Sequence, residues 1–272
     1  MRILIVLHDN SLSQATLQMG SRLSRKNSSP LTVLTVLSNI QLRPKADQLM
    51  GAARQMTEPG KLKTVLRFGH PIKEILAETR AGRYELVVIG EESGQKQTPL
   101  PHDTNISSTL LNQIRVPALF VQGRVRDLHK ILLCDSGGDE TGTLSRFTAN
   151  LTECLDAVPQ ITVLHVMSQI SSTPGAADWS LMAEAEQLIQ ELTPEGVVLE
   201  RDLQVLKQTA HPITPKIRHG FVIDEILSEA QEGDYDLLVI GAHRKEMWQR
   251  LLLEDIAQEL LRRADRSVLI VK

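Results

Sequence analysis

Turns rich in glycine and polar residues are the clearest candidates for chemistry in this chain. Two of them hold Asp135, Ser136, Gly137 and Gly138, and Gly241, His243 and Arg244. Glycine lets backbone N–H groups approach a phosphate, and a carboxylate accepts hydrogen bonds from amino groups. For Asp135, an Asx turn that closes the loop is an equally good interpretation. Further candidates nearer the N-terminus are His8, Asp9, Asn10, Gly90, Gly94, Thr104 and Asn105.

The cysteines and histidines show no spacing typical of catalysis or metal binding. No HxxxH or CxxC occurs, and no Ser–His–Asp or Cys–His set stands at matching strand ends. Cys134 and Cys154 lie in apolar segments, which predicts inert core thiols in a reducing compartment. We therefore expect no metal site and no enzyme active site, and we interpret His8 as structural.

The elements that must position these residues occur twice. Residues 66–90 and 217–241 align without a gap at an offset of 151, and thirteen of the 25 aligned positions are identical. Such a long internal match indicates two copies of one domain. We expect the domains at 1–124 and 128–272.

Each copy alternates short apolar runs with helical patterns. The runs at 3–7, 31–38 and 117–122 correspond to those at 130–134, 161–168 and 267–272. Such runs are typical of strands buried on both faces of a parallel sheet. We predict an α/β fold of two doubly wound domains, each a five-stranded parallel sheet with helices on both faces. Ligands of such sheets bind beyond the carboxyl ends of the strands, where the candidate turns lie. Two helices are predicted to end at Gly82 and Gly233, and a third to run from Pro194 to about Gln208.

Composition excludes several classes of protein. Net charge is −3 over 272 residues and aromatics are 3%, so neither a nucleic-acid nor a membrane partner is indicated. Residues 1–127 carry 17 Lys and Arg against 10 Asp and Glu, whereas residues 128–272 carry 13 against 23. The halves therefore differ in sign, +7 and −10, which favours attraction across their interface. No signal peptide or span of about 18 apolar residues occurs, so a cytoplasmic location is expected.

The block at 218–243, RHGFVIDEILSEAQEGDYDLLVIGAH, resembles the universal stress protein family, as does its first-half counterpart. The whole chain looks like a tandem universal stress protein. This resemblance implies an adenine-nucleotide alpha hydrolase-like fold and a role in stress response. Family members that bind ATP carry an Asp after strand one and Gly-x2-Gly-x9-Gly-Ser/Thr after strand four.

The second half departs from that pattern. Asp135 matches the adenine-side Asp and Gly241 the first glycine, but Arg244, Glu254 and Asp255 stand at the remaining positions. A carboxylate about 4 Å from a phosphate costs about 4 kcal/mol per charge pair near a protein surface. Asp255 is also predicted to cap its own helix with Gln258.

The first half departs less. His8 replaces the Asp, with Asp9 next to it, Gly90 is kept and Gly94 serves after one inserted residue. Thr104 and Asn105, both small and uncharged, replace Gly-Ser.

We therefore expect a non-enzymatic regulatory or binding protein in which ATP binding is weak or absent. The family often pairs such domains through the last strand, so the resemblance implies that 117–122 and 267–272 pair, which forms a pseudo-dimer and removes two sheet edges. Homodimerisation and an unknown protein partner stay open. One alternative is an ATP- or AMP-binding switch that uses one pocket. A second is an ATP pyrophosphatase, because the run 136–141, SGGDET, resembles the phosphate loop SGGxD[ST] of those enzymes.

Overall fold

The computed structural model describes residues 1–7, 12–26, 30–58, 60–91, 106–123, 126–137, 141–167, 184–241 and 256–272. The first half of the chain contains β1 (Ile3–Leu7), α1 (Ser13–Ser24), β2 (Leu31–Leu37), η1 (Ile40–Leu42), α2 (Arg43–Met56), β3 (Leu62–Phe68), α3 (Pro71–Ala81), β4 (Leu86–Gly90), α4 (Ile106–Gln113) and β5 (Ala118–Val121). The second contains β6 (Lys130–Cys134), α5 (Thr143–Thr152), β7 (Gln160–Met167), α6 (Ala185–Gln190), α7 (Pro194–Leu206), β8 (Ile213–His219), α8 (Val222–Glu232), β9 (Leu237–Gly241) and β10 (Ser267–Val271). Residues 256–263 are also helical.

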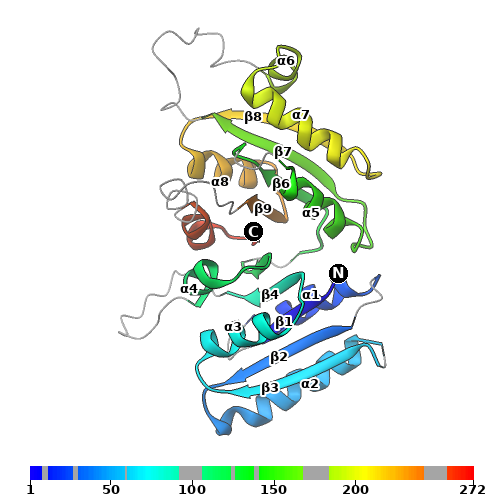
Figure 1. Ribbon diagram of the computed structural model, residues 1–272, viewed down its shortest axis with the longest axis vertical. Coiled ribbons are helices and arrows are strands. Elements are labelled where there is room, and N and C mark those ends of the chain that lie inside the picture. Colours follow the sequence, from blue (N-terminus) through cyan, green and yellow to red (C-terminus); the bar gives the residue numbers. More distant parts are fainter. Residues whose placement is uncertain are drawn as a thin grey trace.

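All ten strands form one sheet in the order β3-β2-β1-β4-β5-β10-β9-β6-β7-β8. Within each half the strands are parallel, and only β5 and β10, at the centre, are antiparallel. The predicted α/β fold is therefore confirmed, and the five parallel strands predicted for each half are joined edge to edge in one sheet. Figure 1 shows the halves stacked along the long axis, with β3 and β8 near its two ends.

Helices cover both faces of this sheet, which explains the continuous apolar runs. On one face, side chains of α1, α2, α5, α6 and α7 pack with alternate strand residues such as Ile5 and Leu133. On the other, α3, α4, α8 and the helix at 256–263 pack with the intervening residues, such as Leu4 and Leu132. The strands β1 and β4 are buried at every position.

The central junction pairs the two edges that the sequence indicated. Leu269 of β10 lies opposite Leu119 of β5. The Nε2 group of Gln122, just after β5, donates to the carbonyl oxygens of Leu261 and Ala264, at 3.1 Å each. Conversely, Lys272 Nζ, after β10, donates to the Leu111 carbonyl oxygen at 2.6 Å. Each half therefore satisfies carbonyl groups at the end of the other's last helix, as expected for a pseudo-dimer.

Gly82 and Gly233 follow α3 and α8 as predicted, but neither forms the left-handed cap that glycine commonly supplies at the end of a helix. Their φ angles are −89° and −81°, so neither is a left-handed C-cap. A Cβ at Gly82 would instead overlap the ring of Tyr84, and one at Gly233 the ring of Tyr235. Close packing of the tyrosine ring therefore explains the glycine at both positions.

The tyrosines belong to a polar network that is present in both halves. Tyr235 Oη donates to Glu229 at 3.0 Å, and Arg218 Nε donates to the same carboxylate at 2.7 Å. In the first half, Tyr84 Oη donates to the Glu78 carboxylate at 2.7 Å, and Arg67 Nη2 donates to the same carboxylate at 2.6 Å. Each network joins the sheet to a helix, and it accounts for much of the identity between the repeats.

Other boundaries differ modestly from the predictions. The helix opened by Thr193 and Pro194 ends at Leu206, not Gln208, and Thr193 Oγ1 accepts from the Gly196 N–H at 3.1 Å as its cap. The predicted capping role of Asp255 falls outside the described residues.

Candidate functional site

The candidate site with the most complete description lies after β6, where the chain leaves the sheet. The chain adds β7 and β8 on one side of β6 and then crosses back to add β9 and β10 on the other side. The switch point of the second half therefore lies between β6 and β9. Cys134 lies opposite Ile240, which places Asp135 and Gly241 one position further along on neighbouring strands. The structure therefore brings together two residues that the sequence singled out 106 positions apart.

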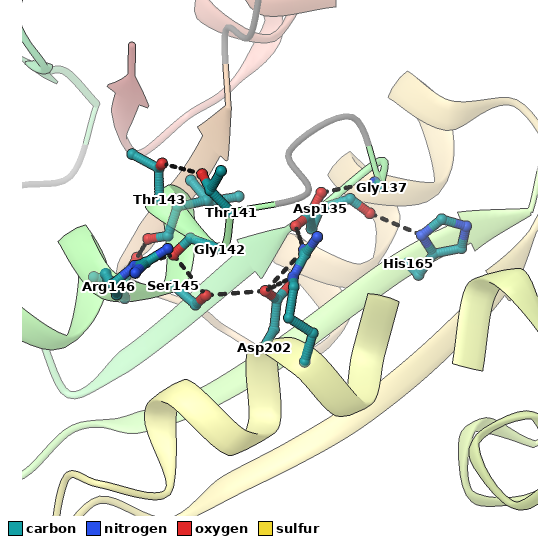
Figure 2. A network of polar contacts seen from close by, with 12 residues as sticks. Asp135, Gly137, Thr141, Gly142, Thr143, Ser145, Arg146, His165 and Asp202 are labelled. Carbon is teal, nitrogen blue, oxygen red and sulfur yellow. Dashed lines mark hydrogen bonds and ion pairs between the residues drawn. The ribbon is translucent and has the colours of Figure 1, made fainter. Parts of the chain in front are cut away.

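Asp135 is 6% exposed, and both of its carboxylate oxygens are engaged by the chain itself. The Gly137 N–H donates to Oδ1 at 2.7 Å, which confirms the Asx turn. Gly137 has φ +77°, a left-handed conformation that glycine adopts at little cost. Arg201 Nη2, from α7, forms an ion pair with Oδ2, and the Asp135 carbonyl oxygen lies 2.8 Å from His165 Nδ1 (Figure 2).

A second carboxylate, Asp202, lies beside this pair and is completely buried. Its Oδ1 accepts from Ser145 Oγ of α5 at 2.9 Å and from Arg201 Nη2 at 2.9 Å. Its Oδ2 is buried and has no hydrogen-bond partner among the described residues. The guanidinium of Arg201 therefore donates to both carboxylates.

Burial is the main cause that raises the pKa of Asp202 to about 7, because an ionised carboxylate is poorly solvated there. The negative charge of Asp135 adds to this rise, and Arg201 opposes it. One positive charge therefore serves two acidic groups, and Asp202 changes its protonation near neutral pH.

Arg201, Asp202 and Ser145 were not among the residues singled out from the sequence. A signal was available on α7, where Leu199, Leu203 and Leu206 form the buried stripe. Asp202 falls three residues after Leu199, on the same face. A carboxylate at such a position needs a partner, which points toward a buried polar cluster.

In the first half, the described part of the candidate site is small. Gly90 ends β4, the Glu91 N–H donates to the Val121 carbonyl oxygen at 2.9 Å, and Ser107 Oγ donates to the Glu91 carboxylate. The other candidates lie outside the described residues: His8, Asp9, Asn10, Gly94, Thr104, Asn105, Gly138, His243 and Arg244. Glu254 and Asp255 do so as well.

The cysteines and acidic residues give no support for metal chemistry. Burial raises the pKa of both the Cys134 and the Cys154 thiols, so neither is an activated nucleophile. Within the described ranges, no three His, Cys, Asp or Glu side chains are placed to hold a metal ion. No helix in those ranges is long and apolar enough to span a bilayer.

Comparisons with known proteins identify the family. A model of the universal stress protein family matches residues 128–272. A universal stress protein of Methanocaldococcus jannaschii is 24% identical over 143 residues, which cover 53% of this chain and 81% of that protein. Two solved structures match all of this chain with a TM-score of 0.69 each. One is a universal stress protein of Archaeoglobus fulgidus, which is 14% identical and is matched over 96% of its own chain. The other is a putative universal stress protein of Pseudomonas aeruginosa, which is 18% identical and is matched over 92% of its own chain. At this identity the two structures support the fold alone, whereas the family match spans more than half of the chain. The chain therefore belongs to the universal stress protein family.

Proposed function

We propose that this protein is a non-catalytic regulatory or binding protein of the cytoplasmic stress response, and that its second half binds ATP weakly or not at all. The observation that carries this proposal is the engagement of Asp135. Its two carboxylate oxygens already accept from the Gly137 N–H and from Arg201. An adenine amino group would have to compete with Arg201 for a carboxylate that is only 6% exposed, and moving Arg201 away would also take the cation from the buried Asp202.

We also propose that residues 1–124 form a second domain of the same family beside 128–272. The repeated block, the matching strand order of the two halves and the repeated Arg–Glu–Tyr network support this assignment. The first half keeps Gly90 and Gly94 and lacks the acidic substitutions of the second. Any nucleotide binding would therefore belong to the first half.

Isothermal titration calorimetry of the intact chain with ATP and with AMP tests whether either half binds nucleotide, and which one. We expect no binding in the micromolar range that depends on the second half. Micromolar binding that is lost in Asp135→Ala would refute the proposal for the second half. Binding that is lost in Gly94→Asp and kept in Asp135→Ala would place a nucleotide site in the first half instead.

Catalysis is tested separately by incubation with ATP and chromatography of the products. We expect no AMP to form. Turnover that disappears in Asp139→Asn would instead support the pyrophosphatase interpretation of SGGDET.

A further inference from the structure

The two outer ends of the sheet are built from equivalent elements but carry opposite charge. We call α2, β3 and α3, residues 43–81, the basic end, and α6, α7, β8 and α8, residues 185–232, the acidic end. The basic end has 8 Lys and Arg against 4 Asp and Glu, a net charge of +4. The acidic end has 4 against 9, a net charge of −5. Figure 1 places the two at opposite extremes of the long axis.

Within the repeated block, the change of sign is confined to solvent-exposed positions. In the aligned blocks 66–90 and 217–241, four differences alter charge, and every one makes the second copy more negative. They are Lys73 and Asp224, Arg80 and Gln231, Ala81 and Glu232, and Arg83 and Asp234, all exposed. The thirteen identical positions of the same blocks include the buried Ile75, Ile226, Glu78 and Glu229. The residues that differ in charge are all at the surface, where Asp224, Glu232 and Asp234 pair with Arg263, Arg218 and Arg126.

The junction between the halves does not account for most of this charge. Arg25 and Asp156 face each other there at 3.5 Å, and Arg126 of the linker reaches Asp234 at 2.7 Å. The β5–β10 contact itself is made by apolar side chains. None of these four residues belongs to either end, so these ion pairs do not use the excess charge of the two ends.

We propose that the basic end of one copy binds the acidic end of a second copy of this chain. Both surfaces belong to the same chain, so they are always present in equal number and have nearly equal and opposite net charge. Exposed apolar side chains accompany them: Ile40, Met56 and Phe68 lie at or beside the basic end, and Leu192, Val197 and Phe221 at the acidic end. Like ends repel, so the contact joins unlike ends.

Side chains make this contact, not an extension of the sheet. The edge strand β8 contains Pro215, which has no N–H to donate, and the exposed Lys216 follows it. Both features oppose strand addition at an edge. Exposed ion pairs are individually weak and are screened by salt. The association is therefore reversible and sensitive to ionic strength.

Sedimentation velocity of the full chain tests the proposal at low and high salt. We expect assembly at about 20 mM NaCl and at least about a tenfold weaker affinity at about 500 mM NaCl. A chain that is monomeric at micromolar concentration in low salt, or assembly that ignores salt, would overturn the proposal.

Charge-reversal variants make the test specific. One carries Lys63→Glu, Lys73→Glu and Arg80→Glu at the basic end, and the other carries Glu186→Lys, Glu191→Lys and Glu200→Lys at the acidic end. Each alone should be monomeric, because both of its ends then tend toward one sign, whereas an equimolar mixture should assemble. Arg115→Glu, an exposed charge outside both ends, is the control and should assemble like the unmodified chain. A mixture that stays monomeric, or single variants that assemble normally, would contradict the pairing of unlike ends. Recovery in the mixture also shows that both variants fold.

Discussion

The cluster around Asp202 predicts an unusual dependence of stability on pH. In the folded protein the pKa of Asp202 is raised to about 7 from an ordinary 3.8, mainly by burial. Because the folded-state pKa lies above the unfolded one, folding favours the protonated form. The contribution to stability is complete below pH 3.8 and is lost as the pH rises toward 7.

The size of this loss follows from the shift. At about 1.4 kcal/mol per pKa unit, a rise of about three units corresponds to about 4 kcal/mol in total. Between about pH 5 and about pH 8 the unfolding free energy should fall by about 3 kcal/mol from this residue. Few single groups change the stability of a domain by so much at neutral pH.

The perturbation that isolates this effect is Asp202→Asn. The amide resembles the protonated acid: its oxygen keeps the bonds from Ser145 and Arg201, and its NH2 replaces the acid proton beside Asp135. Urea unfolding followed by circular dichroism should show the variant gaining about 3 kcal/mol over the unmodified chain between about pH 5 and about pH 8. Asp47→Asn, at an exposed carboxylate on α2, is the matched control and should give a small difference that is the same at both pH values. A constant difference for Asp202→Asn would refute the reasoning, because it would mean that Arg201 keeps Asp202 ionised throughout.

Three further substitutions test the rest of the fold. Glu229→Gln leaves Lys216 and Arg218 without a buried anion and should cost about 3 kcal/mol in urea unfolding at neutral pH. Burial alone would raise the pKa of Glu229, but its hydrogen-bonded neighbours hold that pKa below its ordinary value. The cost of the substitution should therefore shrink as the pH falls below 4.5. A cost that is unchanged at low pH would contradict the role of these ion pairs. Gly233→Ala should lower the free energy of unfolding by about 1 kcal/mol or more, since the new Cβ overlaps the ring of Tyr235. In a Tyr235→Ala background the same substitution should cost less, because the ring is gone. Additive costs in this double-mutant cycle would speak against the overlap. Leu269→Ala, fully buried in β10, should cost about 2–5 kcal/mol in the same assay, whereas Val158→Ala, at an exposed site, should cost little; equal costs would show that the β5–β10 junction contributes little to stability.

The pH prediction and the proposed weak ATP binding depend on the same side chain. Arg201 is the common partner of Asp135 and Asp202, so its removal should affect both measurements. A charge reversal at the outer ends should affect neither. The two sets of variants therefore separate the buried cluster from the surface contact.

The sequence was most informative where the structure is repeated and apolar. Continuous apolar runs identify strands that are buried on both faces, and the aligned blocks predict the same element order twice. The pairing of 117–122 with 267–272 was expected from the resemblance to a family that often pairs its domains through the last strand, and it removes two sheet edges. The sequence was less informative for Gly82 and Gly233, because a glycine after a helix suits a left-handed cap as well as a neighbouring ring.

What the sequence determined by itself is thus the α/β class and the duplication, whereas the central pairing of the two final strands followed from the family resemblance. Only the tertiary structure decided what surrounds Asp135. Arg201 is 66 residues away along the chain, and no local pattern specifies which residue of α7 faces the end of β6. That depends on how α7 packs on α5 and the sheet, which is set by the shapes of many buried side chains together. The same packing buries Asp202 beside Asp135 and so determines whether this carboxylate is free for a ligand or already bound to the protein itself.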